Sequence, residues 1–145
     1  MSIKLQLDGF DDLFEQIKTA GGTVEQAADS CLRESAQIMQ NELKSQMQKS
    51  GVDSGLISRM PSPEIEISGN RFTARVGYKK GAYNPDNLSD GYKVVFINYG
   101  TPKRTKHGKI AEKGFIQRAK GKARPQIKRA QKTTLEKILG RLKSE

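Results

Sequence analysis

The feature that most constrains this fold is one apolar run, residues 92–99, with the sequence YKVVFINY. Val94 and Phe96 fall on one alternating face, and another valine, an isoleucine and a tyrosine fall on the other. A strand with this pattern is covered on both sides, as a strand inside a packed domain is. Gly100 follows, and glycine permits a turn that a side chain would hinder. The run therefore predicts a buried strand that ends at Gly100.

Three further stretches alternate apolar and polar residues, which is the pattern of half-buried strands. They are residues 3–7, 64–68 and 72–78. Gly69-Asn70 separates the last two, and a two-residue turn with glycine first suits a hairpin. The first strand is short, so we expect it at a sheet edge. The hairpin and residues 92–99 together predict an antiparallel meander.

The longest element is a helix predicted over residues 24–49, because apolar residues recur there at helical spacing without an internal proline or glycine. A short helix precedes it over residues 10–17, and Thr23 is placed to cap the long helix. Near the end of the chain, Gly121 predicts a break, and Pro125 predicts the first turn of a final basic helix.

These elements predict an α+β fold in a single domain, residues 1–145. An antiparallel sheet of three to four strands packs against one long α-helix, with a short N-terminal helix and a basic C-terminal helix. A chain of 145 residues can bury roughly 70% of its extended surface, so a real core is possible.

The net charge of +10 is distributed unevenly. Residues 1–99 contain 11 Lys and Arg against 13 Asp and Glu, a net charge of −2, whereas residues 100–145 contain 15 against 3, a net charge of +12. A basic block of this kind is typical of a surface that meets phosphates or an acidic protein. The alternative is a solvated basic face on an amphipathic helix.

The sequence offers no constellation typical of an enzyme. His107 is the only histidine and lies among lysines, without further ligands at metal-binding spacing. The single cysteine, Cys31, falls on the apolar stripe of the long helix, where a small buried hydrophobe is expected. Asp11-Asp12 and the pair Glu64 and Glu66 lack partners for acid–base work. We therefore predict a non-enzyme with no cofactor, no metal site and no membrane-spanning segment.

Two short motifs flank a basic loop: Asn98-Tyr99-Gly100-Thr101 and Gly114-Phe115-Ile116-Gln117-Arg118-Ala119. In this order, they resemble the tail-completion and head-tail joining proteins of long-tailed bacteriophages of the lambda and HK type. Upstream, Ser54-Gly55-Leu56-Ile57 resembles the segment that leads from the long helix to the sheet in that family. The family more often has an acidic residue at the position of Asn98, and a proline before the phenylalanine where this chain has Lys113-Gly114.

The resemblance implies a structural virion protein of the neck or tail, made in the cytoplasm of the host bacterium. It would assemble as a ring, most simply a homo-hexamer, between head-closure or connector proteins and the tail tube or tail terminator, with DNA passing through. The subunit or partner interface is then expected at Tyr99, Gly100, Thr101, Phe115, Ile116 and Arg118, with Phe115 as the apolar anchor. A basic contact surface is expected at Lys103, Arg104, Lys106, Lys109, Lys128, Arg129 and Lys132.

A nucleic-acid-binding module is the alternative function, since non-specific binding depends on Lys and Arg neutralising phosphates. Against it, Phe115 is the only aromatic residue in the basic stretch, so no platform for stacking bases is apparent. No helix-turn-helix or RNA-binding signature is present either.

Overall fold

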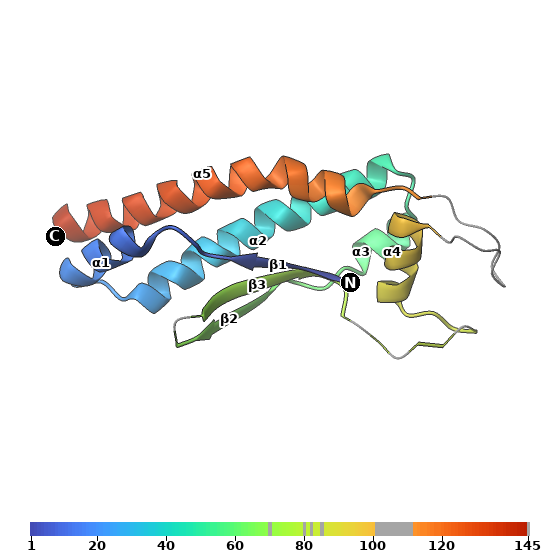
Figure 1. Cartoon of the computed structure of the whole chain (residues 1–145), viewed down its shortest axis with the longest axis horizontal. Helices are drawn as coiled ribbons and strands as arrows, with labels where there is room; N and C mark the ends of the chain where they lie inside the picture. Colours follow the sequence, from blue (N-terminus) through green and yellow to red (C-terminus); the bar gives the residue numbers. More distant parts are fainter. Residues whose placement is uncertain (70, 80, 82, 85, 101–111, 145) are drawn as a thin grey trace.

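The computed structural model describes residues 1–69, 71–79, 81, 83–84, 86–100 and 112–144. The elements follow in the order β1 (Ser2–Gln6), α1 (Asp11–Thr19), α2 (Val24–Lys49), α3 (Ser54–Ser58), β2 (Glu64–Ser68), β3 (Arg71–Gly77), α4 (Asp90–Tyr99) and α5 (Phe115–Ser144). Together they form an elongated α+β structure (Figure 1). The predicted fold class is confirmed: a three-stranded antiparallel sheet packs against a long helix and a C-terminal helix, with a short helix near the N-terminus.

The sheet has the order β1-β3-β2, so both β1 and β2 are edge strands. Ile3 pairs with Val76 on one side of β3, and Ile65 pairs with Ala74 on the other. Ser68 pairs with Arg71, which gives the two-residue hairpin turn that the sequence predicted, and Gly69 there has a φ of 56°. The apolar side chains of all three strands belong to the core that includes α2.

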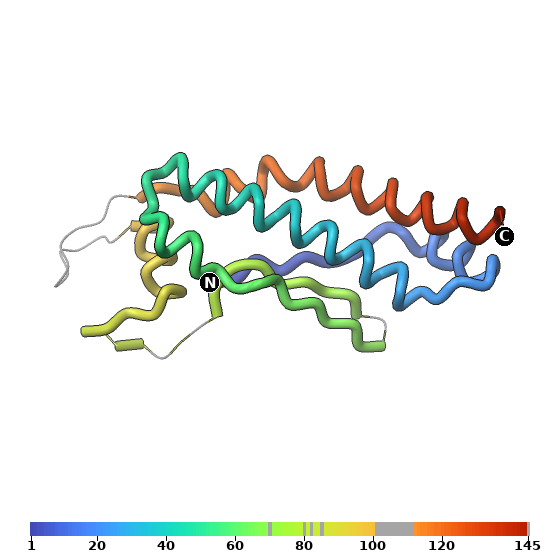
Figure 2. The backbone as a smooth tube through the Cα atoms, turned by 180° about the vertical axis from the view of Figure 1, so that it is seen from behind, coloured from blue at the N-terminus to red at the C-terminus, as the bar shows by residue number. Residues whose placement is uncertain are grey.

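Two long helices, α2 and α5, run antiparallel to each other along the length of the molecule (Figure 2). The helix α2 lies against the sheet and also contacts α5 more extensively than any other pair of elements does. The short helix α1 packs with both long helices in a smaller apolar cluster, which is built around Ile17, Cys31 and Leu135. The prediction that α2 spans residues 24–49 is confirmed, and Cys31 is buried there.

The predicted strand at residues 92–99 is wrong, because these residues form the helix α4. Gly91, Val94 and Asn98 are its buried residues, and their spacing of three and four follows a helix. Both sides of β3 are already paired, and the sequence run contains enough apolar residues to satisfy either periodicity. Gly100 does end the element as predicted, with a φ of 74°.

The predicted break at Gly121 and new helix at Pro125 are also wrong, since α5 is continuous through both positions. A proline inside a helix removes one hydrogen bond and costs roughly 3 kcal/mol. The buried residues Ala119, Ala123 and Ile127 continue one stripe across this point, and the apolar contacts of that stripe offset the cost.

Candidate functional site

The two motifs that flank the basic segment are joined in the structure by a set of hydrogen bonds that we call the loop clamp. It consists of Asn98 at the end of α4, residues 113–118 at the start of α5, and Gln46 and Ser50 at the end of α2. The backbone N–H of Lys113 donates to the carbonyls of Ile97 and Asn98, each at 3.2 Å, and the N–H of Gly114 donates to Asn98 at 3.0 Å. The end of α4 and the residues that precede α5 are therefore joined directly by backbone hydrogen bonds.

The side chain of Asn98 is fully buried and connects α4 to the first turn of α5. Its Oδ1 accepts a hydrogen bond from the backbone N–H of Ile116 at 2.8 Å. Its Nδ2 donates to Oε1 of Gln117 at 3.1 Å. The first N–H groups of a helix have no partner within the helix, so Asn98 acts on α5 as a cap supplied by another element.

The guanidinium of Arg118 holds the outer side of the loop clamp. Its Nη1 donates to the carbonyl of Lys113 at 2.6 Å, its Nη2 donates to Oγ of Ser50 at 2.7 Å, and its Nε donates to Oε1 of Gln46 at 3.3 Å. Arg118, predicted as an interface residue, is exposed and uses three of its five N–H donors in these bonds within the chain. It therefore ties the loop clamp to α2.

Phe115 and Ile116, predicted to contact a partner, are core residues with exposed fractions of 0% and 3%. The expectation that Phe115 is an apolar anchor for another molecule is therefore corrected, because Phe115 has no surface to offer in this conformation. Tyr99, which follows Asn98 at the end of α4, is accessible, with an exposed fraction of 55%. Gly100 ends α4 beside it.

The predicted basic surface is described only in part. Thr101, Lys103, Arg104, Lys106 and Lys109 lie outside the described residues, as does His107. Lys128, Arg129 and Lys132 are exposed on α5, away from the buried stripe that packs on α2. These three residues of the predicted basic surface therefore lie on an accessible face of α5.

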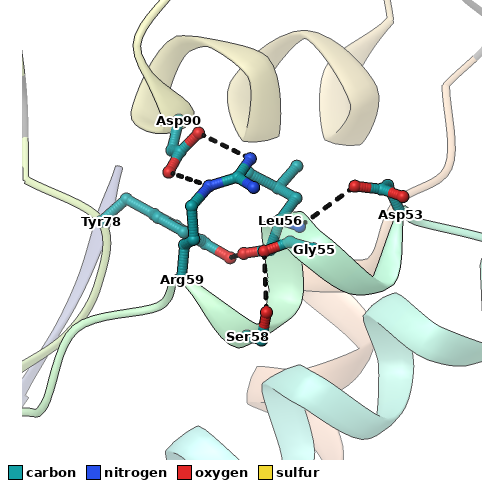
Figure 3. A network of polar contacts seen from close by, with 7 residues as sticks. All are labelled: Asp53, Gly55, Leu56, Ser58, Arg59, Tyr78 and Asp90. Atoms are coloured by element: carbon teal, nitrogen blue, oxygen red, sulfur yellow. Dashed lines mark hydrogen bonds and ion pairs between the residues drawn. The ribbon is translucent and has the colours of Figure 1, made fainter.

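A second polar network fixes the other end of α4, at its first turn (Figure 3). Arg59, just after α3, donates from Nε to Oδ2 of Asp90 at 3.0 Å and from Nη2 to Oδ1 at 3.2 Å. The hydrogen bonds from Arg59 lower the pKa of Asp90. Desolvation by burial acts in the opposite direction, but its effect is smaller. Asp90 also complements the positive end of the α4 dipole.

Tyr78 completes this network from the end of β3. Its hydroxyl donates to the carbonyl of Leu56 in α3 at 2.6 Å (Figure 3). Burial, with a smaller effect of Asp90, raises the pKa of Tyr78 to about 12. No local pattern indicates these contacts, because Tyr78 and Leu56 are 22 residues apart and Arg59 and Asp90 are 31 apart.

The described residues contain no group of three or more His, Cys, Asp or Glu side chains arranged to hold a metal ion. Burial, followed by the charge of Glu34, raises the pKa of the Cys31 thiol to about 12. A protonated thiol inside the core is a poor nucleophile. Within the described part of the chain, no helix is both long enough and apolar enough to span a membrane.

Comparisons of the chain with protein-family models, with curated proteins and with solved structures give no match. The features of this chain that bear on its function are therefore the loop clamp, the basic face of α5 and the two sequence motifs.

Proposed function

We propose that this chain is a structural virion protein at the head-tail junction of a long-tailed bacteriophage, a neck or tail-completion subunit that assembles as a ring. The proposal starts from the motifs Asn98-Tyr99-Gly100-Thr101 and Gly114 to Ala119, which resemble that family. The observation that carries it is the loop clamp, in which both motifs meet. A basic segment with its two ends tied to the body of the domain is suited to reach an adjoining subunit, since loops held by a rigid scaffold commonly carry binding.

Charge provides the second argument for a ring. Closed rings use heterologous contacts, in which one surface of a subunit meets a different surface of the next. The net charge is −2 over residues 1–99 and +12 over residues 100–145, so the two parts of the chain have opposite sign. Electrostatic complementarity of this kind mainly sets the rate of encounter and the register of the contact.

Tyr99 replaces Phe115 as the proposed aromatic contact of the ring. It lies at the loop clamp, it is 55% exposed, and tyrosine is enriched among residues that dominate interfaces. We expect Tyr99→Ser to weaken assembly by a factor on the order of ten, which is typical for loss of an interface anchor. Tyr83, which is 59% exposed and outside the loop clamp, offers the matched control Tyr83→Ser.

The test is native mass spectrometry of the full chain over a range of concentrations, with and without isolated phage tail tubes. We expect the unmodified chain and Tyr83→Ser to form a ring or to associate with the tube. We expect Tyr99→Ser to show less ring formation and less association with the tube. A chain that remains monomeric at high concentration and binds neither tail tubes nor connector proteins would contradict the proposal.

A nucleic-acid-binding module is the second candidate, favoured by the exposed cations of α5. The only aromatic residue of that helix, Phe115, is buried and cannot stack on a base. Fluorescence anisotropy with a labelled DNA duplex separates the two: a binder loses affinity steeply as salt rises, whereas no binding at low salt removes this candidate.

A further inference from the structure

A groove runs between the edge strand β1 and the helix α5, with Met39 of α2 among the residues that line it. Its volume is about 800 Å³, within the range of roughly 300–1,000 Å³ that ligand-binding clefts have. The apolar part of the lining consists of Ile3, Leu5, Phe10, Met39 and Ile127. Both β1 and α5 extend along the long axis of the molecule (Figure 1).

One wall of the groove is an unpaired strand edge. In antiparallel pairs, hydrogen-bonded residues alternate with residues whose N–H and C=O groups point the other way. Met1 and Tyr78 exchange backbone hydrogen bonds, 2.6 Å for the N–H of Tyr78 and 3.1 Å for the amine of Met1. The alternation turns the backbone of Ile3 and Leu5 toward β3, and that of Lys4 and Gln6 toward the groove. No described strand pairs with this side of β1.

The other wall carries a row of cations along α5. Lys120, Arg124, Lys128 and Lys132 recur at intervals of four residues, all exposed and all lining the groove. Lys132 has an ion pair with Glu136 at 4.0 Å, whereas no such pair is formed by the other three with any residue that the structure describes. Lys4 adds a cation from β1, and Asp8 is the one acidic residue of the lining.

The spacing of this row matches that of an extended chain. Four residues of an α-helix advance roughly 6 Å along its axis. Two residues of a strand advance roughly 6.6 Å, and these two side chains point to the same face. Acidic side chains at every second position of a strand laid along α5 would therefore meet successive cations. The intervening side chains of such a strand would point to the opposite face of the sheet, away from α5.

We propose that this groove binds an extended, acidic segment of a partner protein, which pairs with β1 as a fourth strand and places alternate Asp or Glu side chains along Lys120, Arg124 and Lys128. Strand addition suits the groove because the backbone of β1 supplies affinity and the side-chain row supplies specificity. A nucleic acid would use the cations but would leave the N–H and C=O groups of Lys4 and Gln6 without a matching partner. The proposal does not depend on the assignment to a virion.

The probe is a fluorescein-labelled peptide, Ser-Val-Glu-Val-Glu-Val-Glu-Ser, titrated with the full-length chain in a fluorescence anisotropy assay. We expect the paired change Arg124→Glu with Lys128→Glu to weaken binding at least roughly tenfold, because two attractive charge contacts become repulsive. The matched control is Lys122→Glu with Lys137→Glu, two exposed cations of α5 outside the groove, with a change of less than about twofold.

A second pair of variants tests the strand edge itself. Lys4→Pro removes an outward N–H that β3 does not use, and a proline is tolerated on the free side of an edge strand. Lys4→Ala removes the same charge but keeps the N–H. We expect Lys4→Pro to weaken peptide binding severalfold beyond Lys4→Ala, with far-UV circular dichroism unchanged in both.

Three results would overturn the proposal. The first is equal binding of the peptide by the unmodified chain and by Arg124→Glu with Lys128→Glu. The second is equal competition by a DNA duplex, or by a peptide with its glutamates in one block, since either would indicate a purely electrostatic surface. The third is self-association of the chain, seen by sedimentation and abolished by the Arg124→Glu pair, which would assign the groove to a second copy.

Discussion

Replacing Asn98 by alanine is the sharpest test of the loop clamp. The side chain is fully buried, and its Oδ1 is the acceptor for the N–H of Ile116 at 2.8 Å. Gln117, which receives the other hydrogen bond, is exposed and can turn to water, so its loss costs little. The main cost of Asn98→Ala is therefore the buried N–H of Ile116, which is left without a partner.

An unsatisfied buried N–H costs roughly 1–3 kcal/mol, so we expect Asn98→Ala to lower the free energy of unfolding by about 2 kcal/mol. For a domain near this size, that loss lowers Tm by roughly 4–8 °C. The assay is urea unfolding followed by circular dichroism, together with a thermal scan. Limited proteolysis of the native state adds a local readout, since an opened loop clamp should expose the adjoining segment to cleavage.

The matched variant is Asn98→Asp, which keeps an acceptor for the N–H of Ile116 and places a negative charge at the start of α5, where the helix dipole favours it. Because Asn98 is fully buried, the charged form of the new carboxyl is penalised at pH 7. We expect Asn98→Asp to approach the stability of the unmodified chain as pH falls, because the protonated carboxyl keeps an acceptor for Ile116 and supplies a donor to Gln117. A loss of less than about 0.5 kcal/mol for Asn98→Ala would refute this role of Asn98, as would an Asn98→Asp variant that stays as unstable as Asn98→Ala at a pH where its carboxyl is protonated.

Four further predictions follow from the described contacts. Tyr78→Phe should lower stability by about 1 kcal/mol through loss of the bond to Leu56. Because the folded-state pKa of Tyr78 is raised from 10.0 to about 12, stability should also fall as pH rises through that range, with the Tyr78 phenol titrating late at 295 nm. Asp90→Asn should weaken the chain slightly at pH 7, and the difference from the unmodified chain should vanish as pH falls through the lowered pKa of Asp90; a difference that persists in acid would contradict this. Cys31 should react with a thiol reagent in guanidinium but only slowly in the native chain, and rapid native labelling would contradict its burial.

The local patterns of the sequence predicted much of this fold. Residues 24–49 place apolar residues along one face of a long uninterrupted helix. An apolar face of that width is buried in a folded domain, whichever elements pack against it. The alternation in residues 64–68 and 72–78, with glycine at the turn, favours a register in which both isoleucines of the hairpin pack against the core and are partly buried. These elements follow from the spacing of apolar residues, which recur every 3.6 residues in a helix and every second residue in a strand. Both spacings can be identified in the local sequence.

Only the tertiary structure decided residues 92–99 and the continuity of α5. A run such as YKVVFINY satisfies both periods, and it is a helix here because β3 is already paired on both sides while Val94 and Asn98 pack inward from α4. Gly121 and Pro125 predict a break by their own preferences, and contacts with α2 on both sides of them override those preferences. The loop clamp and the groove beside β1 depend on residues far apart in sequence, such as Asn98 with Ile116 and Lys4 with Arg124. Local sequence determines periodicity and turns, whereas the packing of distant segments determines which surfaces remain open for a partner.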